Sequence, residues 1–169
     1  MGIRETLESY GITSVYHFTD KANLRTIEQY GLQSLKNILS LNIPVKHFGA
    51  EELSHNLDQR KGLDHFVHLS FIKDHPMYYM AKKRGNIINP VWIELDLSII
   101  FEENALFSDK VANQNGAKIF NIQQVLEFID FNKLLFEQEF KKRVEARKAE
   151  IMIQYSINTN YIKGITYGN

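Results

Sequence analysis

Two short segments of the chain alternate between hydrophobic and polar residues in the way that a half-buried strand requires. Residues 15–19 set apolar rings against polar groups, and residues 67–71 do the same with valine, leucine and phenylalanine. The polar faces of these two strands carry His17, Thr19, His68 and Ser70. The two segments therefore predict strands that offer imidazole and hydroxyl groups on the side away from the core.

A third strand of this kind is predicted over residues 149–155. It directs Ile151, Ile153 and Tyr155 toward the core and leaves Glu150 at its start on the opposite face. Further strands are predicted over 91–100, which is rich in branched residues, and over 161–167. The chain therefore contains at least one complete sheet.

Helical spacing and helix-ending residues predict several helices between these strands. They cover 4–10, 20–31, 51–60 and 77–84, with two more inside 121–148. Asp20 can cap the second of these helices, and Gly31 can end it in a left-handed turn. Residues 101–120 are rich in asparagine and read as a long loop. The pattern predicts a mixed α+β fold with one core, forming a single domain over residues 1–169.

The amino-acid composition excludes several kinds of functional site. The 169 residues contain 20 basic and 20 acidic side chains, so any contact with nucleic acid or a membrane must be local. The absence of cysteine excludes disulfides, thiolate zinc sites and a cysteine nucleophile. No spacing typical of metal ligands occurs, so we predict no metal. The polar N-terminus and the lack of an apolar run of about 18 residues predict a cytoplasmic protein without a membrane segment.

If the three polar strand faces lie in one sheet, they form a cleft floor with two imidazoles, two hydroxyls and a carboxylate. Each of these residues also has an interpretation without a functional role. His17 could be a half-buried strand histidine bonded to a carbonyl, and Glu150 could be exposed to solvent. Arg60 could be a solvated charge and Tyr78 a core aromatic. No GxGxxG or GxxxxGK motif is present, so a Rossmann mode of dinucleotide binding is not expected.

Several blocks of the sequence resemble, in order, the DarT family of nucleic-acid ADP-ribosyltransferases. The resemblance runs from residue 15 to about 155 and rests on residues 15–19, 22–34, Arg60, 66–71, 75–79 and 148–152. It implies an ADP-ribosyltransferase-like fold, in which two small sheets with surrounding helices enclose an NAD cleft. NAD is then a co-substrate, cleaved at its nicotinamide bond.

The resemblance also implies roles for particular residues. Glu150 would hold the ribose hydroxyl and stabilise positive charge on the sugar, and Arg60 would reach the NAD phosphates and assist transfer as a charge stabiliser. The implied cofactor-binding residues are His17, Phe18, Thr19, Asn23, Gly31, Ser34, Ser70, Met77 and Tyr78.

The acceptor implied by the resemblance is a base in single-stranded DNA. The segment 101–120 corresponds to the acceptor-binding loop, where Phe107 could stack on a base and Asn113, Gln114 and Asn115 could bond base edges. An ordinary polar loop is the alternative. The second strand and the residue two before Glu150, a lysine in place of glutamine, depart from the better-known branch, so the base is not named.

The resulting hypothesis is an NAD-dependent mono-ADP-ribosyltransferase that modifies a nucleobase in single-stranded DNA. It would act as a toxin of a toxin–antitoxin or phage-defence system and have a macrodomain antitoxin as its partner. Transfer to RNA or protein is a second reading, and an inactive nucleotide- or nucleic-acid-binding module is a third. A tRNA 2′-phosphotransferase is disfavoured because it would not need Glu150.

Overall fold

The structure is a computed structural model that describes residues 1–47 and 61–168. Its strands are β1 (Ser14–Asp20), β2 (Leu32–Gln33), β3 (Phe66–Leu69), β4 (Pro90–Asp96), β5 (Leu106–Ser108), β6 (Ile119–Phe120), β7 (Glu150–Gln154), β8 (Ser156–Ile157) and β9 (Ile162–Tyr167). Its α-helices are α1 (Ile3–Ser9), α2 (Leu24–Tyr30), α3 (Leu35–Ser40), α5 (Pro76–Lys83), α6 (Val125–Phe128), α7 (Phe131–Phe136) and α8 (Phe140–Ala146). Short 3₁₀ helices cover Lys21–Asn23, Leu97–Phe101, Ile122–Gln124 and Thr159–Tyr161.

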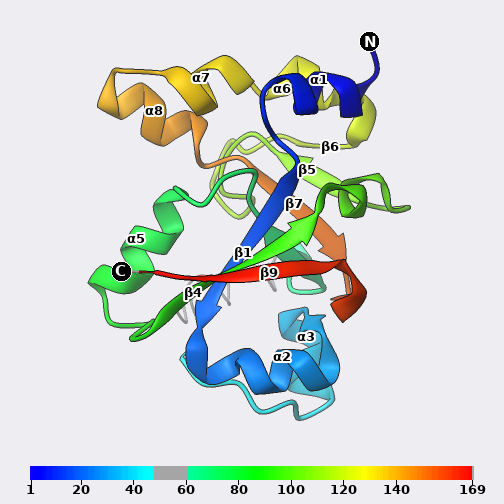
Figure 1. Ribbon diagram of the computed structural model, residues 1–169, viewed down its shortest axis with the longest axis vertical. Helices are drawn as coiled ribbons and strands as arrows, with labels where there is room; N and C mark the ends of the chain where they lie inside the picture. Colours follow the sequence, from blue (N-terminus) through cyan, green and yellow to red (C-terminus); the bar gives the residue numbers. More distant parts are fainter. Residues whose placement is uncertain (48–60, 169) are drawn as a thin grey trace.

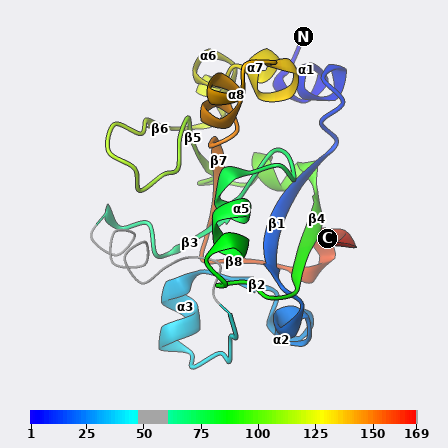
Figure 2. The same ribbon diagram turned by 90° about the vertical axis from the view of Figure 1, so that its left-hand side faces the viewer.

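The strands form two small antiparallel sheets and one short pair. One sheet has the order β1-β4-β9, the other has the order β3-β7-β5-β6, and β2 pairs with β8 (Figures 1 and 2). Helices α1, α6, α7 and α8 lie at one end of the molecule, and α2 and α3 lie at the other (Figures 1 and 2). The mixed α+β fold with small sheets and surrounding helices is therefore confirmed.

The two larger sheets meet at one isolated pair of residues. The Tyr16 amide donates to the Ser70 carbonyl and the Ser70 amide donates to the Tyr16 carbonyl, each at 2.8 Å. Of the three strands with polar faces, β3 and β7 are direct neighbours, whereas β1 belongs to the other sheet. The polar faces thus approach one another across the join between two sheets and do not share a single sheet.

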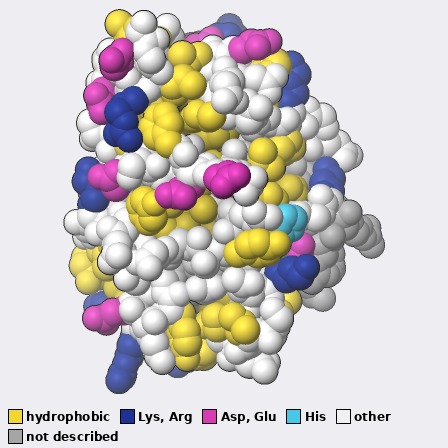
Figure 3. Space-filling view, turned by 90° about the vertical axis from the view of Figure 1, so that its right-hand side faces the viewer, with side chains coloured by type: hydrophobic (Ala, Val, Ile, Leu, Met, Phe, Trp, Pro, Cys, Tyr) yellow, Lys and Arg dark blue, Asp and Glu magenta, His cyan; other side chains and the backbone are white. Residues whose placement is uncertain are grey.

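The main core lies where the apolar faces of both sheets meet, and it includes Val15, Ile93 and Ile151, all fully buried. A second, smaller buried cluster consists of Leu63, Phe66, Ala112 and Met152. Because neighbouring strand residues point to opposite faces, Met152 faces away from the core that Ile151 enters. Strand β7 is thus covered on both faces. On the molecular face shown in Figure 3, the hydrophobic side chains lie in separate patches among polar groups.

Several predicted elements agree with the structure. Helices α1 and α5 match the predictions over 4–10 and 77–84, and the segment 20–31 forms a 3₁₀ turn followed by α2. Asp20 caps this turn by accepting the Ala22 amide at 2.9 Å, and Gly31 has a φ of 75°. The helix predicted over 51–60 lies outside the described residues.

Other boundaries differ for local reasons. The strand predicted over 91–100 ends at Asp96, because the Asp96 carboxylate accepts the Ser98 amide at 2.8 Å and starts a 3₁₀ helix. The segment 121–148 holds three short α-helices, and Asp130 caps the second of them. The prediction that Tyr155 faces the core is wrong: it takes a φ of 64° at the end of β7 and is 49% exposed.

The prediction of a long loop over 101–120 is correct for residues 109–118 but misses two short strands. This segment contains β5 and β6, which extend the sheet beyond β7. Phe107 in β5 is fully buried, with its ring stacked between those of Phe71 and Phe120. Its ring is therefore used in the core and has no face open to a base, contrary to the expectation from the sequence.

Candidate active site

A cavity of about 230 Å³ lies between the two larger sheets, at the end of the molecule that holds α2 and α3. Its lining comes from β1, β3, β7 and the helices around them. The residues singled out from the sequence that line it are His17, Phe18, Thr19, Asn23, Gly31, His68, Met77, Asn113 and Glu150. Six of the nine predicted cofactor-binding residues thus face one space together with the predicted catalytic carboxylate.

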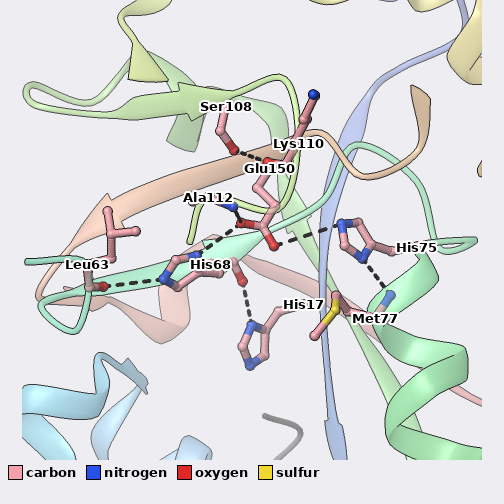
Figure 4. Close-up of polar contacts among 9 residues, drawn as sticks. All are labelled: His17, Leu63, His68, His75, Met77, Ser108, Lys110, Ala112 and Glu150. Carbon is pink, nitrogen blue, oxygen red and sulfur yellow. Dashed lines mark hydrogen bonds and ion pairs between the residues drawn. The ribbon is translucent and has the colours of Figure 1, made fainter. Parts of the chain in front are cut away.

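Glu150 presents a buried carboxylate to this cavity, with only 8% of the residue exposed. Its Oε2 atom accepts the Ala112 amide at 2.9 Å and lies 3.4 Å from Nδ1 of His68 (Figure 4). Burial alone would raise the pKa of Glu150, but the two nearby histidines and the Ala112 amide outweigh it and lower the pKa. The carboxylate is therefore held ionised inside a largely apolar pocket.

His68 stands between two oxygen acceptors. Its Nδ1 faces Glu150, and its Nε2 lies 3.4 Å from the Leu63 carbonyl oxygen (Figure 4). A doubly protonated imidazole, with a donor on each nitrogen, satisfies both oxygens at once. His68 comes from β3 and Glu150 from β7, so the pairing of these strands brings the two side chains together.

His17 faces the same cavity from the other sheet. Its Nδ1 lies 2.9 Å from the His68 carbonyl oxygen, which can only accept a hydrogen bond, so this nitrogen carries the proton. Burial lowers the pKa of His17 and keeps the imidazole neutral. The Nε2 atom is then an acceptor, suited to a hydroxyl or amide donor. A histidine bonded to a backbone carbonyl was the structural alternative considered for His17 from the sequence. In the structure His17 makes this bond and also lines the cavity.

His75 approaches Glu150 from the side opposite His68. It precedes α5, its Nδ1 accepts the Met77 amide at 3.2 Å, and its Nε2 lies 4.0 Å from Oε1 of Glu150 (Figure 4). Burial lowers the pKa of His75, although the Glu150 carboxylate opposes this effect. No role for His75 was predicted from the sequence. The one signal available was its position directly before the helix-opening proline, which is where a capping side chain sits.

Asn23 fixes the rim of the cavity. Its side chain accepts the Lys46 amide at 2.7 Å and donates to both the Lys46 carbonyl and Oγ1 of Thr19. These bonds hold residues 43–47, of which Ile43, Val45 and His47 line the cavity. Asn23 thus shapes the site by holding a neighbouring segment in place.

Ser34, Ser70 and Tyr78 do not line the cavity. The Ser34 hydroxyl caps α3, and the Ser70 hydroxyl donates to the Ile72 carbonyl at 2.7 Å. Tyr78 is 5% exposed, and its ring packs on Trp92 at a centroid distance of 4.8 Å. The sequence placed these three residues against the cofactor, whereas their side chains are engaged in capping, a turn and aromatic packing.

A second hollow of about 380 Å³ adjoins the first. Met77, Val111 and Asn113 line both spaces. The second is completed by Met80, Gln114, Asn115 and Lys148. The three polar residues predicted to contact a base therefore lie together beside the main cavity, next to a lysine.

Arg60 lies outside the described residues. Among residues 1–47 and 61–168, no cluster of three or more histidine, aspartate or glutamate side chains could hold a metal ion. Within the same ranges, no helix has both the length and the apolar character needed to cross a membrane.

Comparison with known proteins agrees with this geometry. A sequence model of the family described as "ssDNA thymidine ADP-ribosyltransferase, DarT" matches residues 16–169. Comparison with curated proteins finds no match.

Solved structures share the fold. Thermus sp. 2.9 DarT in complex with ADP-ribosylated ssDNA has a TM-score of 0.75 and 16% identity, and the match covers 94% of this chain and 83% of that one. The complex of Thermus sp. 2.9 DarT with NAD⁺ has a TM-score of 0.66 and 14% identity, covering 91% and 81%. Thermosipho africanus DarTG in complex with ADP-ribose has a TM-score of 0.72 and 18% identity. The match covers 93% of this chain but 44% of the Thermosipho chain.

Proposed function

The chain belongs to the DarT family of ssDNA thymidine ADP-ribosyltransferases, and on this premise we propose that it transfers a single ADP-ribose from NAD to a nucleobase in single-stranded DNA. The observation that carries the proposal is the buried, ionised carboxylate of Glu150, which faces His17 across an apolar cavity. In this reaction the bond between nicotinamide and the ribose breaks, its electron pair leaves with nicotinamide, the ribose carbon bonds to a nitrogen of the base, and the base releases the proton of that nitrogen to solvent.

Glu150 supplies what this bond cleavage requires. Positive charge builds up on the ribose as the nicotinamide leaves, as it does on a sugar during glycoside hydrolysis, and a fixed carboxylate stabilises that charge. Oε2 is already engaged by the Ala112 amide and faces His68, so Oε1 is the oxygen left to hold a ribose hydroxyl. The low pKa keeps the group charged at neutral pH.

Other residues hold the co-substrate. The neutral His17 offers Nε2 as an acceptor, and Phe18 and Met77 provide apolar surface for the nicotinamide ring. Gly31 lies at the wall, where the lack of a side chain lets the Ile157 backbone pack directly against it and so fixes the edge of the cavity. Arg60 remains a proposed second catalytic residue that reaches the NAD phosphates and acts as a charge stabiliser, because a guanidinium stays protonated in proteins.

The acceptor base is proposed to enter the second hollow. Asn113, Gln114 and Asn115 can hydrogen-bond the edge of a base, and Lys148 can contact a backbone phosphate. Thermus sp. 2.9 DarT, which shares the fold, is described in complex with ADP-ribosylated ssDNA. The name DarTG of the Thermosipho protein agrees with a role as the toxin of a toxin–antitoxin system. We therefore propose that this chain acts as a toxin in the cytoplasm and is neutralised by a macrodomain antitoxin.

The test compares the wild-type chain with Glu150→Gln, which keeps the shape of the side chain and removes its charge. Purified protein is incubated with labelled NAD and a mixed panel of single-stranded DNA oligonucleotides, and label transfer and nicotinamide release are measured. We expect Glu150→Gln to lower the rate about 10²- to 10³-fold, the usual loss for one such transition-state contact. Glu127→Gln, an exposed change on α6, serves as the matched control and should keep full activity.

The acceptor arms of the assay decide between substrates. Labelling of DNA by the wild type at the level of Glu150→Gln would refute the proposal for DNA. Labelling of RNA or lysate protein while the DNA panel stays blank would assign the same chemistry to a different acceptor. NAD binding without nicotinamide release would instead identify a binding module.

A further inference from the structure

His75 lies at this site, although no pattern in the sequence predicted a role for it. The Met77 amide donates to its Nδ1 at 3.2 Å, and this bond caps α5. A ring nitrogen that accepts a hydrogen bond carries no proton, so a neutral His75 must carry its proton on Nε2. The helix cap therefore fixes the tautomer of His75.

The Nε2 proton of His75 points toward the catalytic carboxylate. Nε2 lies 4.0 Å from Oε1 of Glu150, and only 2% of the histidine is exposed. Nε2 is a buried nitrogen without a hydrogen bond of 3.5 Å or less among the described residues, and the nearby Lys148 backbone acts to raise the pKa of His75. Buried polar groups in folded proteins nearly always have a partner, so a lone donor beside a carboxylate calls for an explanation.

The two sides of the Glu150 carboxylate are therefore unlike. Oε2 accepts the Ala112 amide at 2.9 Å and has Nδ1 of His68 at 3.4 Å. Oε1 has only the more distant Nε2 of His75 near it among the polar contacts described above. Oε2 is thus held by a hydrogen bond, whereas Oε1 has a single nearby donor, His75 Nε2, which would have to move closer to form one.

We propose that His75 is a positioning residue for Glu150, whose Nε2–H closes onto Oε1 when the ribose is bound and fixes the carboxylate against the reacting carbon. This inference rests on the proposed function, because it gives the carboxylate its role in ribose binding. A cap alone does not account for a histidine here, since serine, threonine, aspartate or asparagine cap a helix equally well. Only the imidazole adds a second, oppositely directed nitrogen that reaches Glu150.

The substitution His75→Asn separates the two roles. The asparagine oxygen still accepts the Met77 amide, so the cap is kept, but its NH2 group ends short of the position of Nε2 and no longer reaches Glu150. We expect kcat for nicotinamide release to fall about tenfold, the value of one hydrogen bond to a charged group, with KM for NAD within twofold of wild type. His75→Ala, which removes both the cap and the donor, should lose thermal stability in addition.

A pH profile provides a measurement that a purely structural role would not affect. Glu150 must be ionised, so activity is lost as the pH falls through its pKa. Without the His75 donor, this acidic limb should shift to higher pH in His75→Asn. The other titratable groups around the carboxylate are His68 on β3, His17 across the cavity and Lys148, whose charge acts on His75. All of them are unchanged in the variant.

The proposal is also testable without turnover. Nitrogen chemical shifts of the wild-type histidines report the tautomer directly, and we expect the proton of His75 on Nε2. Carboxyl carbon shifts should show a higher pKa for Glu150 in His75→Asn than in wild type. A proton on Nδ1, or an active wild type that His75→Asn matches in kcat and in pH profile, would overturn the proposal. An inactive wild type would refute the proposed function alone, because the tautomer and the Glu150 titration would still decide the role of His75.

Discussion

Replacement of Asn23 by alanine tests whether this residue serves the cavity by holding its rim. The change removes three hydrogen bonds, two to the backbone of Lys46 and one to Oγ1 of Thr19. Asn23 is 4% exposed, so water does not readily replace them. At about 1 kcal/mol each, their loss amounts to about 3 kcal/mol. For a chain of this size, each kcal/mol lowers Tm by about 2–4 °C, so the expected decrease is about 6–12 °C.

The expected effect of Asn23→Ala on the kinetics follows from the segment that these hydrogen bonds hold in place. Residues 43–47 line the cavity but not the carboxylate, so their release weakens NAD binding without altering bond cleavage. We expect KM for NAD to rise about tenfold with kcat within twofold of wild type, and the Lys46 amide to exchange its hydrogen faster. Ser40→Ala, an exposed change on the neighbouring helix α3, is the control and should alter stability by less than about 0.5 kcal/mol.

Thermal denaturation, steady-state kinetics and hydrogen exchange together provide the test. An Asn23→Ala variant with wild-type Tm and KM would refute the argument that this side chain holds the rim. A fall in kcat with unchanged KM would instead place Asn23 in contact with the reacting part of NAD.

Three further predictions concern residues that support the cavity or lie close to it. Gly31→Ala should lower the free energy of unfolding by more than Gly85→Ala. Both glycines have a φ of 75°, but a Cβ at Gly31 would lie 2.4 Å from a backbone oxygen, whereas a Cβ at Gly85 would meet open space. Equal losses in urea titrations would contradict this prediction. Burial alone would raise the pKa of Asp20, but three backbone amides lower it, so its stabilising effect is present above about pH 3.9 and lost as the pH falls through the lower folded pKa. The deficit of Asp20→Asn in unfolding free energy, about 1–3 kcal/mol at pH 7, should therefore shrink toward pH 2. Tyr78→Phe should leave KM for NAD within twofold of wild type, because the ring packs outside the cavity; a large rise would show that the hydroxyl contacts the cofactor.

The parts of the site that the sequence predicted depend on periodicity along single strands. Alternation placed His17 on the polar face of β1 and Glu150 at the start of β7, and the structure brings both to one cavity. Alternation also set His68 beside them, although the strands come from two sheets. A two-residue period survives without knowledge of the strand's neighbours, because it follows from backbone geometry alone.

The parts that the sequence did not predict depend on contacts between distant segments. Strand β5 has three residues and β6 has two, too few for an alternating pattern, so Phe107 was read as a loop residue when it belongs to the core. The role inferred for His75 depends on where the start of α5 lies relative to β7, which no local pattern encodes. The prediction that residues 1–169 form a single domain stays a prediction.

The backbone bonds between Tyr16 and Ser70 couple the two larger sheets beside the cavity. His17 belongs to one sheet and Glu150 to the other, and each sheet is held by its own strand pairing. The bond from His17 to the His68 carbonyl crosses the same join, and the main core packs the apolar faces of both sheets together. The separation of His17 and Glu150 is thus set by contacts next to the cavity, so a substitution at this join would change the width of the site while leaving the pairing within each sheet intact.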